Sequence, residues 1–292
     1  MTSTTQDVPH EDKQYPRFRT MARIEHAILM VSFTVLAITG LPQKYALQAW
    51  AEGMINVMGG IEFVRIIHRW AAIVLVIGSI YHIFTSAYRF FVKRERMRML
   101  PEKKDAQDVI QTIKHNLGLT DEAPRMAKFN FGEKVEYWAV VWGTAIMAIT
   151  GFVLWNPIAA TVLLPGQFIP AAKAAHGGEA LLAVLSIVIW HMYNVHIKHF
   201  NPSMFTGKLP RHQMEEEHAL ELERLEAGGD PWPELSLPVR QRRQRIFFAV
   251  AAVVGILLLV GLIWAFTFEQ TAIETIPRVT REVFVPLSTP SP

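Results

Sequence analysis

Four histidines lie within two strongly apolar segments at similar intervals. His176 and His191 are fifteen residues apart, and His68 and His82 are fourteen apart. At about 1.5 Å per helical residue, fifteen residues span about 22 Å of the ~30 Å hydrocarbon core of a bilayer. A neutral imidazole is costly in lipid unless a partner holds it. Histidines near both ends of two membrane helices therefore favour axial ligation of two stacked haems.

The helical rotation between these histidines keeps each pair roughly on one face. At ~100° per residue, fourteen steps rotate by about −40° and fifteen by about +60°. His26, at the start of an earlier apolar segment, lies at the same expected depth as His82 and His191. Ligands on facing helices of a four-helix bundle accept planar cofactors between them. Two such cofactors would lie ~20 Å apart, a spacing that suits electron transfer across a membrane.

The composition restricts the choice of redox cofactor. The chain has 292 residues, is 51% hydrophobic and contains no cysteine. Without cysteine it cannot hold iron–sulfur clusters, covalently attached c-type haem or thiolate zinc sites. Any resident redox group must be held by His or Met, or bound without a covalent link.

Several segments of about 20 residues with almost no charge indicate membrane helices. We expect them at about 21–41, 66–88, 136–155, 174–197 and 246–268. The fold class is therefore an all-α membrane protein, with a four-helix transmembrane haem-binding bundle plus a fifth C-terminal transmembrane helix. The expected division is a cytoplasmic N-terminal segment (1–20), the bundle (21–200) with a cytoplasmic loop (89–134), a cytoplasmic linker (201–245) with an amphipathic helix at about 213–227, the fifth helix (246–268) and an exported tail (269–292).

Lysine and arginine are distributed unevenly among the connecting segments. Residues 1–25, 89–134 and 198–245 contain four, eleven and eight of them, whereas 42–65, 156–175 and 269–292 contain two, one and two. The positive-inside rule then places the N-terminus in the cytoplasm and the C-terminus outside. We expect a multi-pass protein of the cytoplasmic (inner) membrane, in contact with the lipid bilayer and with no nucleic-acid partner.

A weak internal repeat relates the two halves of the bundle. The sequence Ala-Ile-Thr-Gly ends at Gly40 and again at Gly151, and in each copy a glutamate, Glu25 or Glu136, precedes the glycine by fifteen residues. The next apolar segment of each copy carries the paired histidines. The bundle is therefore expected to consist of two related helical hairpins about a pseudo-twofold axis along the membrane normal.

Two other functional classes stay open at this stage. The first is a non-redox membrane scaffold with hydrogen-bonded structural histidines. The second is a proton-coupled transporter, which needs further intramembrane acids, and only Glu179 qualifies. Glu179 follows His176 by one turn, so it could equally orient that imidazole.

The chain resembles the dihaem cytochrome b (gamma) subunit of respiratory formate dehydrogenases, close to the cytochrome b subunits of nickel–iron hydrogenases. The resemblance covers about residues 17–225, and its motifs are RIEHAILM with a later TG, VRIIHRW, KFNFGEKVEYW with TGFVLWNP, and AHGGEALLA with WHMY. It implies an outer haem b held by His68 and His176 and an inner haem b held by His26 and His191. It also implies menaquinone or another quinone bound at Asn130 and Gly132, close to His191.

Three features depart from that family pattern. His82 has no ligand counterpart, the His176–His191 interval is one residue longer than usual, and a fifth helix and a tail are added. The internal repeat pairs His82 with His191, as in the cytochrome b of quinol–cytochrome c reductases, whereas the resemblance pairs His26 with His191. We favour His26, and the other histidine then becomes a supporting group or a ligand of a third haem.

These observations predict a membrane-anchoring, electron-transfer subunit of a quinone-linked oxidoreductase, with no catalytic pocket of its own. Electrons would pass between an iron–sulfur or multihaem cytochrome c subunit on the outer face, the two haems and a quinone at the inner face. Protons would exchange with the cytoplasm, with Glu133, Lys134 and His196 as candidate carriers. Asn130 and Glu133 also match a helix capping box. The direction of electron flow stays open.

Overall fold

Long apolar helices dominate the computed structural model, which describes residues 13–229 and 235–267. Five helical spans are long and apolar enough to cross a membrane. They are α1 (Thr20–Lys44), α3 (Ile61–Phe91), α5 (Phe131–Trp155), α7 (Phe168–Leu185) with its π-helical continuation η2 (Ser186–His191) and η3 (Tyr193–Lys198), and α11 (Leu237–Thr267). The prediction of an all-α membrane protein with a fifth C-terminal helix is confirmed.

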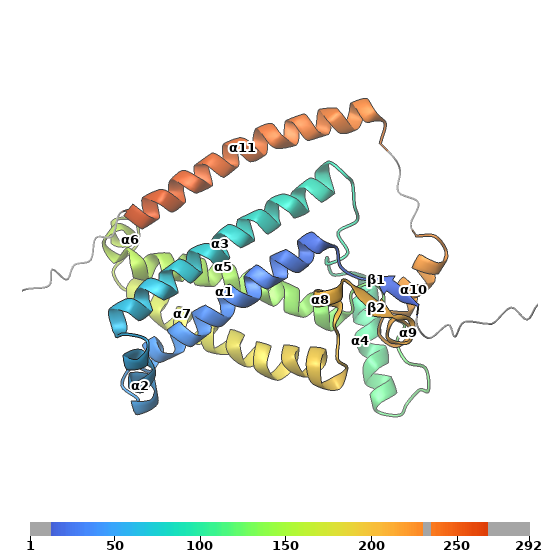
Figure 1. The fold of residues 1–292 in the computed structure, drawn as a ribbon, viewed down its shortest axis with the longest axis horizontal. Helices are drawn as coiled ribbons and strands as arrows, with labels where there is room; N and C mark the ends of the chain where they lie inside the picture. Colours follow the sequence, from blue (N-terminus) through green and yellow to red (C-terminus); the bar gives the residue numbers. More distant parts are fainter. Residues whose placement is uncertain (1–12, 230–234, 268–292) are drawn as a thin grey trace, which may run out of the picture.

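The first four spans form two helical hairpins. Helix α1 packs mainly on α3, and α5 packs mainly on α7, while α1 also contacts α7. Short helices connect the partners of each hairpin, α2 (Ala49–Val57) in the first and α6 (Pro157–Leu163) in the second. Both connections lie at the same end of the bundle (Figure 1). This end is called the α2 end below.

The helix ends differ modestly from the prediction. Helix α1 runs through Pro42 to Lys44 instead of ending near Gly40. A proline in the last turn removes only one backbone hydrogen bond, so the helix continues. The start of α5 is a complete capping box, in which Asn130 Oδ1 accepts from the Glu133 amide at 2.8 Å and Glu133 Oε2 accepts from the Asn130 amide at 2.9 Å. The predicted capping box is therefore confirmed.

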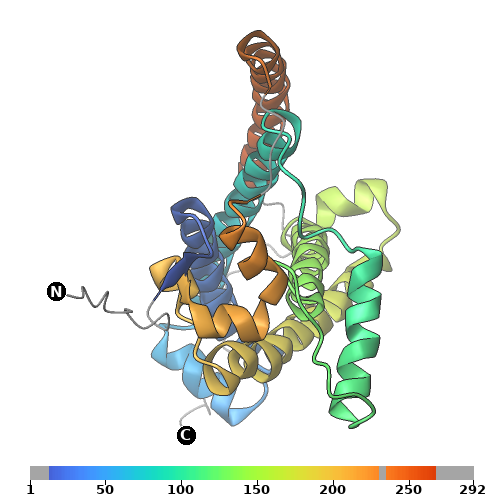
Figure 2. The ribbon, with the colours of Figure 1, turned by 90° about the vertical axis from the view of Figure 1, so that its right-hand side faces the viewer.

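A small polar subdomain, called the cap below, closes the opposite end of the bundle (Figures 1 and 2). It combines the segments expected to be a cytoplasmic loop and a linker with part of the expected N-terminal segment. Its elements are β1 (Gln14–Pro16), α4 (Lys103–Asn116), α8 (Ser203–Thr206), β2 (Lys208–Pro210), α9 (Arg211–Glu217) and α10 (Ala219–Glu226). Strands β1 and β2 pair antiparallel, with Tyr15 opposite Leu209.

The cap has its own apolar core, made of Tyr15, Leu209, Met214 and Leu222. Its two long segments are joined by the Arg98–Glu221 ion pair at 2.9 Å and by a hydrogen bond between His218 Nδ1 and the Ala127 carbonyl at 3.0 Å. His218 also separates α9 from α10, so the single amphipathic helix expected here is two helices.

Helix α11 lies on the periphery, beside α3 (Figures 1 and 2). It begins at Leu237, earlier than the predicted residue 246. The Tyr88 and Phe247 rings are 5.3 Å apart near its start, and Asn156 Nδ2 donates to the Ala265 carbonyl at 3.2 Å near its end. The predicted tail (269–292) and the first twelve residues lie outside the described residues.

Candidate functional site

Four histidines inside the bundle form two pairs, and the two rings of each pair lie close together. His68 of α3 and His176 of α7, called the first pair, have ring centres 6.4 Å apart. His26 of α1 and His191 at the end of η2, called the second pair, have ring centres 6.3 Å apart. Each pair therefore joins one helix of the first hairpin to the second hairpin.

These ring distances fit one iron between two imidazoles. A metal–imidazole bond is about 2 Å long and the ring centre lies about 1 Å beyond the nitrogen, so two rings on opposite sides of one metal have centres about 6 Å apart. Both measured distances match this value. Among the described residues, no group of three or more His, Asp or Glu side chains is arranged to hold a metal ion. The pairs thus fit axial ligation of a haem, whose macrocycle supplies the other donors.

Threonines fix the tautomers of the first pair. Thr39 Oγ1 lies 2.9 Å from His68 Nδ1, and Thr150 Oγ1 lies 2.9 Å from His176 Nδ1. Each threonine hydroxyl already donates its one hydrogen to its own helix, to the Val35 carbonyl at 2.7 Å and the Ile146 carbonyl at 2.6 Å. The histidine Nδ1–H must then be the donor to the threonine. The Nε2 lone pair of each ring is left for a metal.

Glycines next to these threonines make room for the two rings. A Cβ atom added to Gly40 would lie 3.0 Å from His68 Cε1, and one added to Gly151 would lie 3.3 Å from His176 Cε1. Any larger residue would press against the imidazole. In each half of the bundle, the threonine of the Thr-Gly repeat therefore hydrogen-bonds one histidine, and the glycine leaves space for its ring.

Glutamates hold the histidines nearest the cap. Glu136 Oε2 lies 2.9 Å from His191 Nδ1, and Glu25 Oε2 lies 2.8 Å from His82 Nδ1. A carboxylate accepts, so each ring donates its Nδ1–H, and His191 keeps Nε2 for a metal. His82 differs, because its Nε2 is 3.1 Å from the Tyr137 hydroxyl. A neutral His82 ring thus has both nitrogens engaged by protein groups.

The π-helical turn accounts for the long interval between His176 and His191. A π-helix holds one extra residue per turn compared with an α-helix, and η2 ends at His191 itself. The extra residue is thereby taken up before the second histidine. As a result, His191 contacts Glu136 in the same way that His82 contacts Glu25. This holds although His191 follows His176 by fifteen residues and His82 follows His68 by only fourteen.

The residues expected to bind quinone lie at the start of α5. A Cβ atom on Gly132 would lie 3.2 Å from Asn130 Oδ1 and 3.6 Å from the ring of Trp190, the residue before His191. The structure therefore brings Gly132 and Asn130 close to Trp190, which precedes His191 in the chain. The Asn130 Oδ1 atom is used by the capping box, and its Nδ2 atom has no partner among the described contacts.

Two of the candidate proton carriers, Glu133 and Lys134, contact residues outside the histidine pairs, as does Glu179, the acid considered for a transporter. Glu133 accepts from Arg17 Nη2 at 2.8 Å through Oε1 and caps α5 through Oε2. Lys134 is buried and forms an ion pair with Asp105 at 2.8 Å. Glu179 packs against Gly143, where an added Cβ would lie 2.6 Å from Glu179 Oε1. None of the three contacts a histidine of either pair in the described contacts.

Comparison with known proteins is consistent with these pairs. Residues 17–207 match the model of the prokaryotic cytochrome b561 family. The chain belongs to the prokaryotic cytochrome b561 family. The match includes all four spans of the bundle and both histidine pairs. The chain is therefore a multi-pass membrane cytochrome b, and membership of the family implies haem b.

Several relatives of this family have been characterised. The chain is 22% identical to the cytochrome b556(Fdn) subunit of the nitrate-inducible formate dehydrogenase of Escherichia coli (strain K12), over 74% of this chain and 95% of the relative. It is 22% identical to the cytochrome b556(fdo) subunit of another formate dehydrogenase of that strain, over 61% and 76%. It is 26% identical to a formate dehydrogenase cytochrome b556 subunit of Haemophilus influenzae, over 50% and 56%. The resemblance stated from the motifs is confirmed.

Sequence reasoning missed the residues that support the histidines. The internal repeat contains Thr39, Thr150 and Glu136, but the sequence gives these residues no chemical role. Tyr137 occupies the repeat position of His26, but the sequence gives it no chemical role. The signal was the repeat itself, which matches a supporting residue in one half to its equivalent in the other.

Proposed function

We propose that this cytochrome b is the electron-transfer subunit of a respiratory oxidoreductase and holds two b haems, one between His68 and His176 and one between His26 and His191. The observation that carries the proposal is the pair of ring-centre distances, 6.4 Å and 6.3 Å. Each haem supplies one-electron chemistry when bound. The chain's own residues engage Nδ1 of His68, His176 and His191, which leaves Nε2 of each ring for a metal.

His26 is favoured over His82 as the partner of His191. The His26 and His191 rings face each other across the bundle, whereas His82 is bonded through Nδ1 to Glu25 and through Nε2 to Tyr137. An imidazole with both nitrogens in use has no lone pair for a metal. His82 is then a hydrogen-bonded member of the bundle, in line with the family resemblance.

The two haem positions lie at different depths and define a path. The first pair lies toward the α2 end, and the second pair toward the cap. The cap contains most of the lysines and arginines, which favours the cytoplasm for that side and the cytoplasmic membrane as the location. Electrons would then cross the membrane between an outer partner and the cytoplasmic side.

The relatives favour a formate dehydrogenase-type complex. Those named above are cytochrome b subunits of formate dehydrogenases. Because this chain has no cysteine, a partner must supply any iron–sulfur cluster. An iron–sulfur or multihaem cytochrome c subunit on the outer face fits that requirement, and the exposed helix α11 offers a surface that could anchor it.

Menaquinone or another quinone is proposed to bind beside the second pair. Asn130 Nδ2 is placed to donate to a quinone carbonyl while Asn130 Oδ1 keeps its capping bond. Gly132 leaves space between Asn130 and Trp190. A quinone here lies within reach of both the second haem position and the aqueous cap, which supplies or takes up its protons.

The deciding experiment is a reduced-minus-oxidised spectrum of the purified chain, with haem quantified per polypeptide. Two b-type haems are expected. Replacing His68 or His176 with Ala should remove the same haem, and replacing His26 or His191 should remove the other. Replacement of His82 is the matched control and should leave both. Absence of haem from protein made with haem in excess would instead favour a scaffold or a transporter.

A further inference from the structure

Near the cap, the two hairpins have the same glutamate–histidine contact but differ in the residue that follows the glutamate. Glu25 holds His82 at 2.8 Å in the first half, and Glu136 holds His191 at 2.9 Å in the second. The residue after Glu25 is His26, and the residue after Glu136 is Tyr137. The pseudo-twofold axis therefore relates His82 to His191 and Tyr137 to His26.

The ring contacts follow the same pseudo-twofold correspondence. His26 faces His191 with ring centres 6.3 Å apart, and Tyr137 faces His82 with ring centres 5.9 Å apart. The first pair needs no such counterpart, because the axis relates His68 and His176 to each other. At the depth of the second pair, the bundle thus has two equivalent positions, one between α1 and α7 and one between α3 and α5.

We propose that the position between α3 and α5 is a latent haem site and that Tyr137 keeps it closed. This inference rests on the proposed function of the second pair. Two ligand atoms on one iron lie about 4 Å apart, at about 2 Å each. The Tyr137 hydroxyl and His82 Nε2 are only 3.1 Å apart and are joined by a hydrogen bond. Tyr137 therefore limits the chain to one haem at this depth.

The test is Tyr137→His in the full chain, with haem b counted per polypeptide and titrated by redox potential. The native protein should contain two haems and the variant three, the third with its own midpoint potential. The double variant Tyr137→His/His82→Phe should return to two, because it removes the other ligand. His82→Phe alone should keep both native haems.

Two results would overturn the inference. One is a count of two or fewer in Tyr137→His, and the other is the loss of a haem in His82→Phe. The native protein separates this failure from failure of the proposed function. Two native haems with no third in the variant reject the latent site alone, whereas fewer than two native haems reject the ligand pairs themselves.

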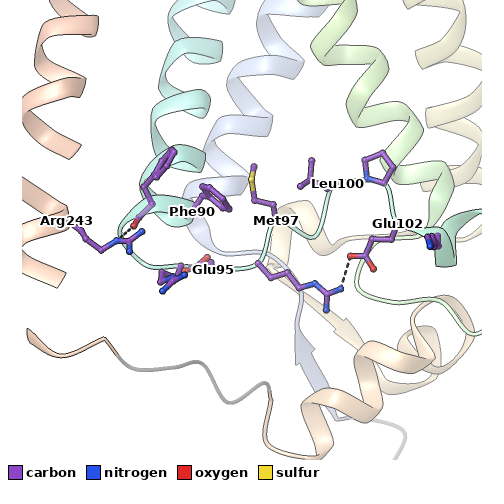
Figure 3. A pocket seen from close by; sticks show the side chains of 11 residues that line it. Phe90, Glu95, Met97, Leu100, Glu102 and Arg243 are labelled. Carbon is purple, nitrogen blue, oxygen red and sulfur yellow. Dashed lines mark hydrogen bonds and ion pairs between the residues drawn. The ribbon is translucent and has the colours of Figure 1, made fainter. Parts of the chain in front are cut away.

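An open pocket of about 730 Å³ lies between the cap-side end of α3 and the start of α11. Figure 3 shows the apolar side chains of Phe90, Met97 and Leu100 on the side of the membrane helices, with Glu95 and Glu102 on the opposite side. The pocket therefore spans the boundary between the apolar helices and the polar cap.

The pocket carries an excess of unpaired positive charge. Its two carboxylates are already engaged, Glu95 by Arg89 at 2.6 Å and Glu102 by Arg96 at 3.0 Å. The other cations of the lining, Arg94, Lys103 and Arg243, form no ion pair in the part of the chain that the structure describes. Arg243 Nε donates to the Phe91 carbonyl at 2.5 Å, which ties α11 to the pocket.

The backbone of Arg94 is strained in the turn that follows α3, and its side chain lines the pocket. Its φ is +55°, and it is the one non-glycine residue with positive φ in the described ranges 13–229 and 235–267. Such conformations persist where the surroundings hold them and are common at binding sites. A turn built from glycine would be less strained but would provide no charge here.

We infer that this pocket binds the phosphate of an anionic phospholipid, with the acyl chains lying along Phe90, Phe91 and α11. Basic pockets between membrane helices bind such headgroups, and arginine forms strong charge-assisted hydrogen bonds to phosphate. The apolar wall distinguishes this ligand from free phosphate, which would leave that wall exposed to water.

Native mass spectrometry of the full chain in detergent tests the site with phosphatidylglycerol, phosphatidylcholine and inorganic phosphate. Phosphatidylglycerol should bind in preference to phosphatidylcholine, and Arg94→Gln/Arg243→Gln should weaken its binding by about tenfold or more. Arg65→Gln, an exposed arginine at the other end of α3, is the matched control. Unchanged haem spectra show that each variant is folded.

Three outcomes would overturn the lipid site. They are equal binding of the two lipids, an equal loss in Arg65→Gln, and competition by millimolar inorganic phosphate that removes the lipid from the native protein. The last would assign the pocket to a free phosphate.

Discussion

Thr39 Oγ1 lies 2.9 Å from His68 Nδ1, and the same 2.9 Å separates Thr150 Oγ1 from His176 Nδ1. These two contacts are the clearest expression of the internal repeat, because they join equivalent atoms in the two halves. Each threonine also places its hydroxyl hydrogen on its own helix, so the direction of the bond to the imidazole is fixed. The metal-binding face of each ring is therefore set before any cofactor arrives.

Replacing Thr39 with Val should weaken haem binding at the first pair and shift its midpoint potential. Valine keeps the shape but removes the acceptor of the His68 Nδ1–H, and loss of such a supporting bond typically costs about 10- to 100-fold in metal affinity. Haem content and a redox titration check this result, and the potential of the second haem should not change.

Thr34→Val is the matched control for this prediction. Thr34 lies on the same helix and also donates to its own backbone, to the Met30 carbonyl at 2.8 Å, but among the described residues it has no hydrogen bond to a histidine. It should leave both potentials at native values. An equal shift in Thr34→Val and Thr39→Val would contradict the supporting role of Thr39.

Adding a methyl group at Gly40 should displace His68 more than the equivalent change at Gly151 displaces His176. The added Cβ lies 3.0 Å from the ring at Gly40 and 3.3 Å at Gly151. We expect Gly40→Ala to lower the content of the first haem and Gly151→Ala to have a smaller effect. Gly178→Ala, where nothing lies within 4 Å, should keep both haems, since alanine favours a helix.

Two replacements of Asn130 should separate quinone binding from helix capping. Asn130→Ser keeps a capping oxygen but lacks the amide donor, so quinone turnover should fall while stability stays near native. Asn130→Ala loses both functions and should also be about 1 kcal/mol less stable. Turnover is measured with a soluble quinol, with haem content as the control. Native turnover in Asn130→Ser would refute the quinone contact.

The cap should lose stability as the pH falls from about 6.5 toward 4. Burial, aided by the charge of Arg17, lowers the pKa of His218 from its usual 6.5 to about 4. The unfolded chain therefore takes up a proton in this window while the folded chain does not, and up to about 3 kcal/mol of stability present above pH 6.5 is lost. Thermal unfolding at several pH values measures this slope.

His218→Gln isolates that contribution, because glutamine does not titrate and its amide can still donate to the Ala127 carbonyl. The pH slope of this variant should be shallower than that of the native cap. The neighbouring Glu217 acts in the opposite sense, since burial raises its pKa and favours the folded state at low pH. A native slope in His218→Gln would exclude His218 as its source.

The positions of the membrane helices could be predicted from sequence because they depend on local composition. Apolar length identified all five spans. It placed the start of the third span at about residue 136, whereas α5 begins at Phe131, directly after the capping residue Asn130. The break at His218 could not be predicted, because α9 and α10 turn there to let His218 reach the Ala127 carbonyl of a distant segment. The pairing of Tyr15 with Leu209 was likewise invisible, since no local pattern links these residues.

The candidate site was predictable in its residue types but not in its partners. The spacing of histidines in apolar segments selected His68, His82, His176 and His191 as candidates, and the family resemblance implied the pairing of His68 with His176. The choice between His26 and His82 needed the hydrogen bonds of Glu25 and Tyr137, which depend on how two hairpins pack. The π-helical turn also escaped prediction, because it changes which backbone groups bond without changing the apolar pattern.

The π-helical turn has a consequence for how the two hairpins correspond. If the two hairpins are aligned without a gap from His68 and His176 onward, His82 falls opposite Trp190 and the correspondence is lost one residue before His191. A single-residue gap placed within η2 restores it. The two halves of the bundle therefore match as copies of one helical hairpin that differ in length by one residue, and the wider π-helical turn accommodates the difference.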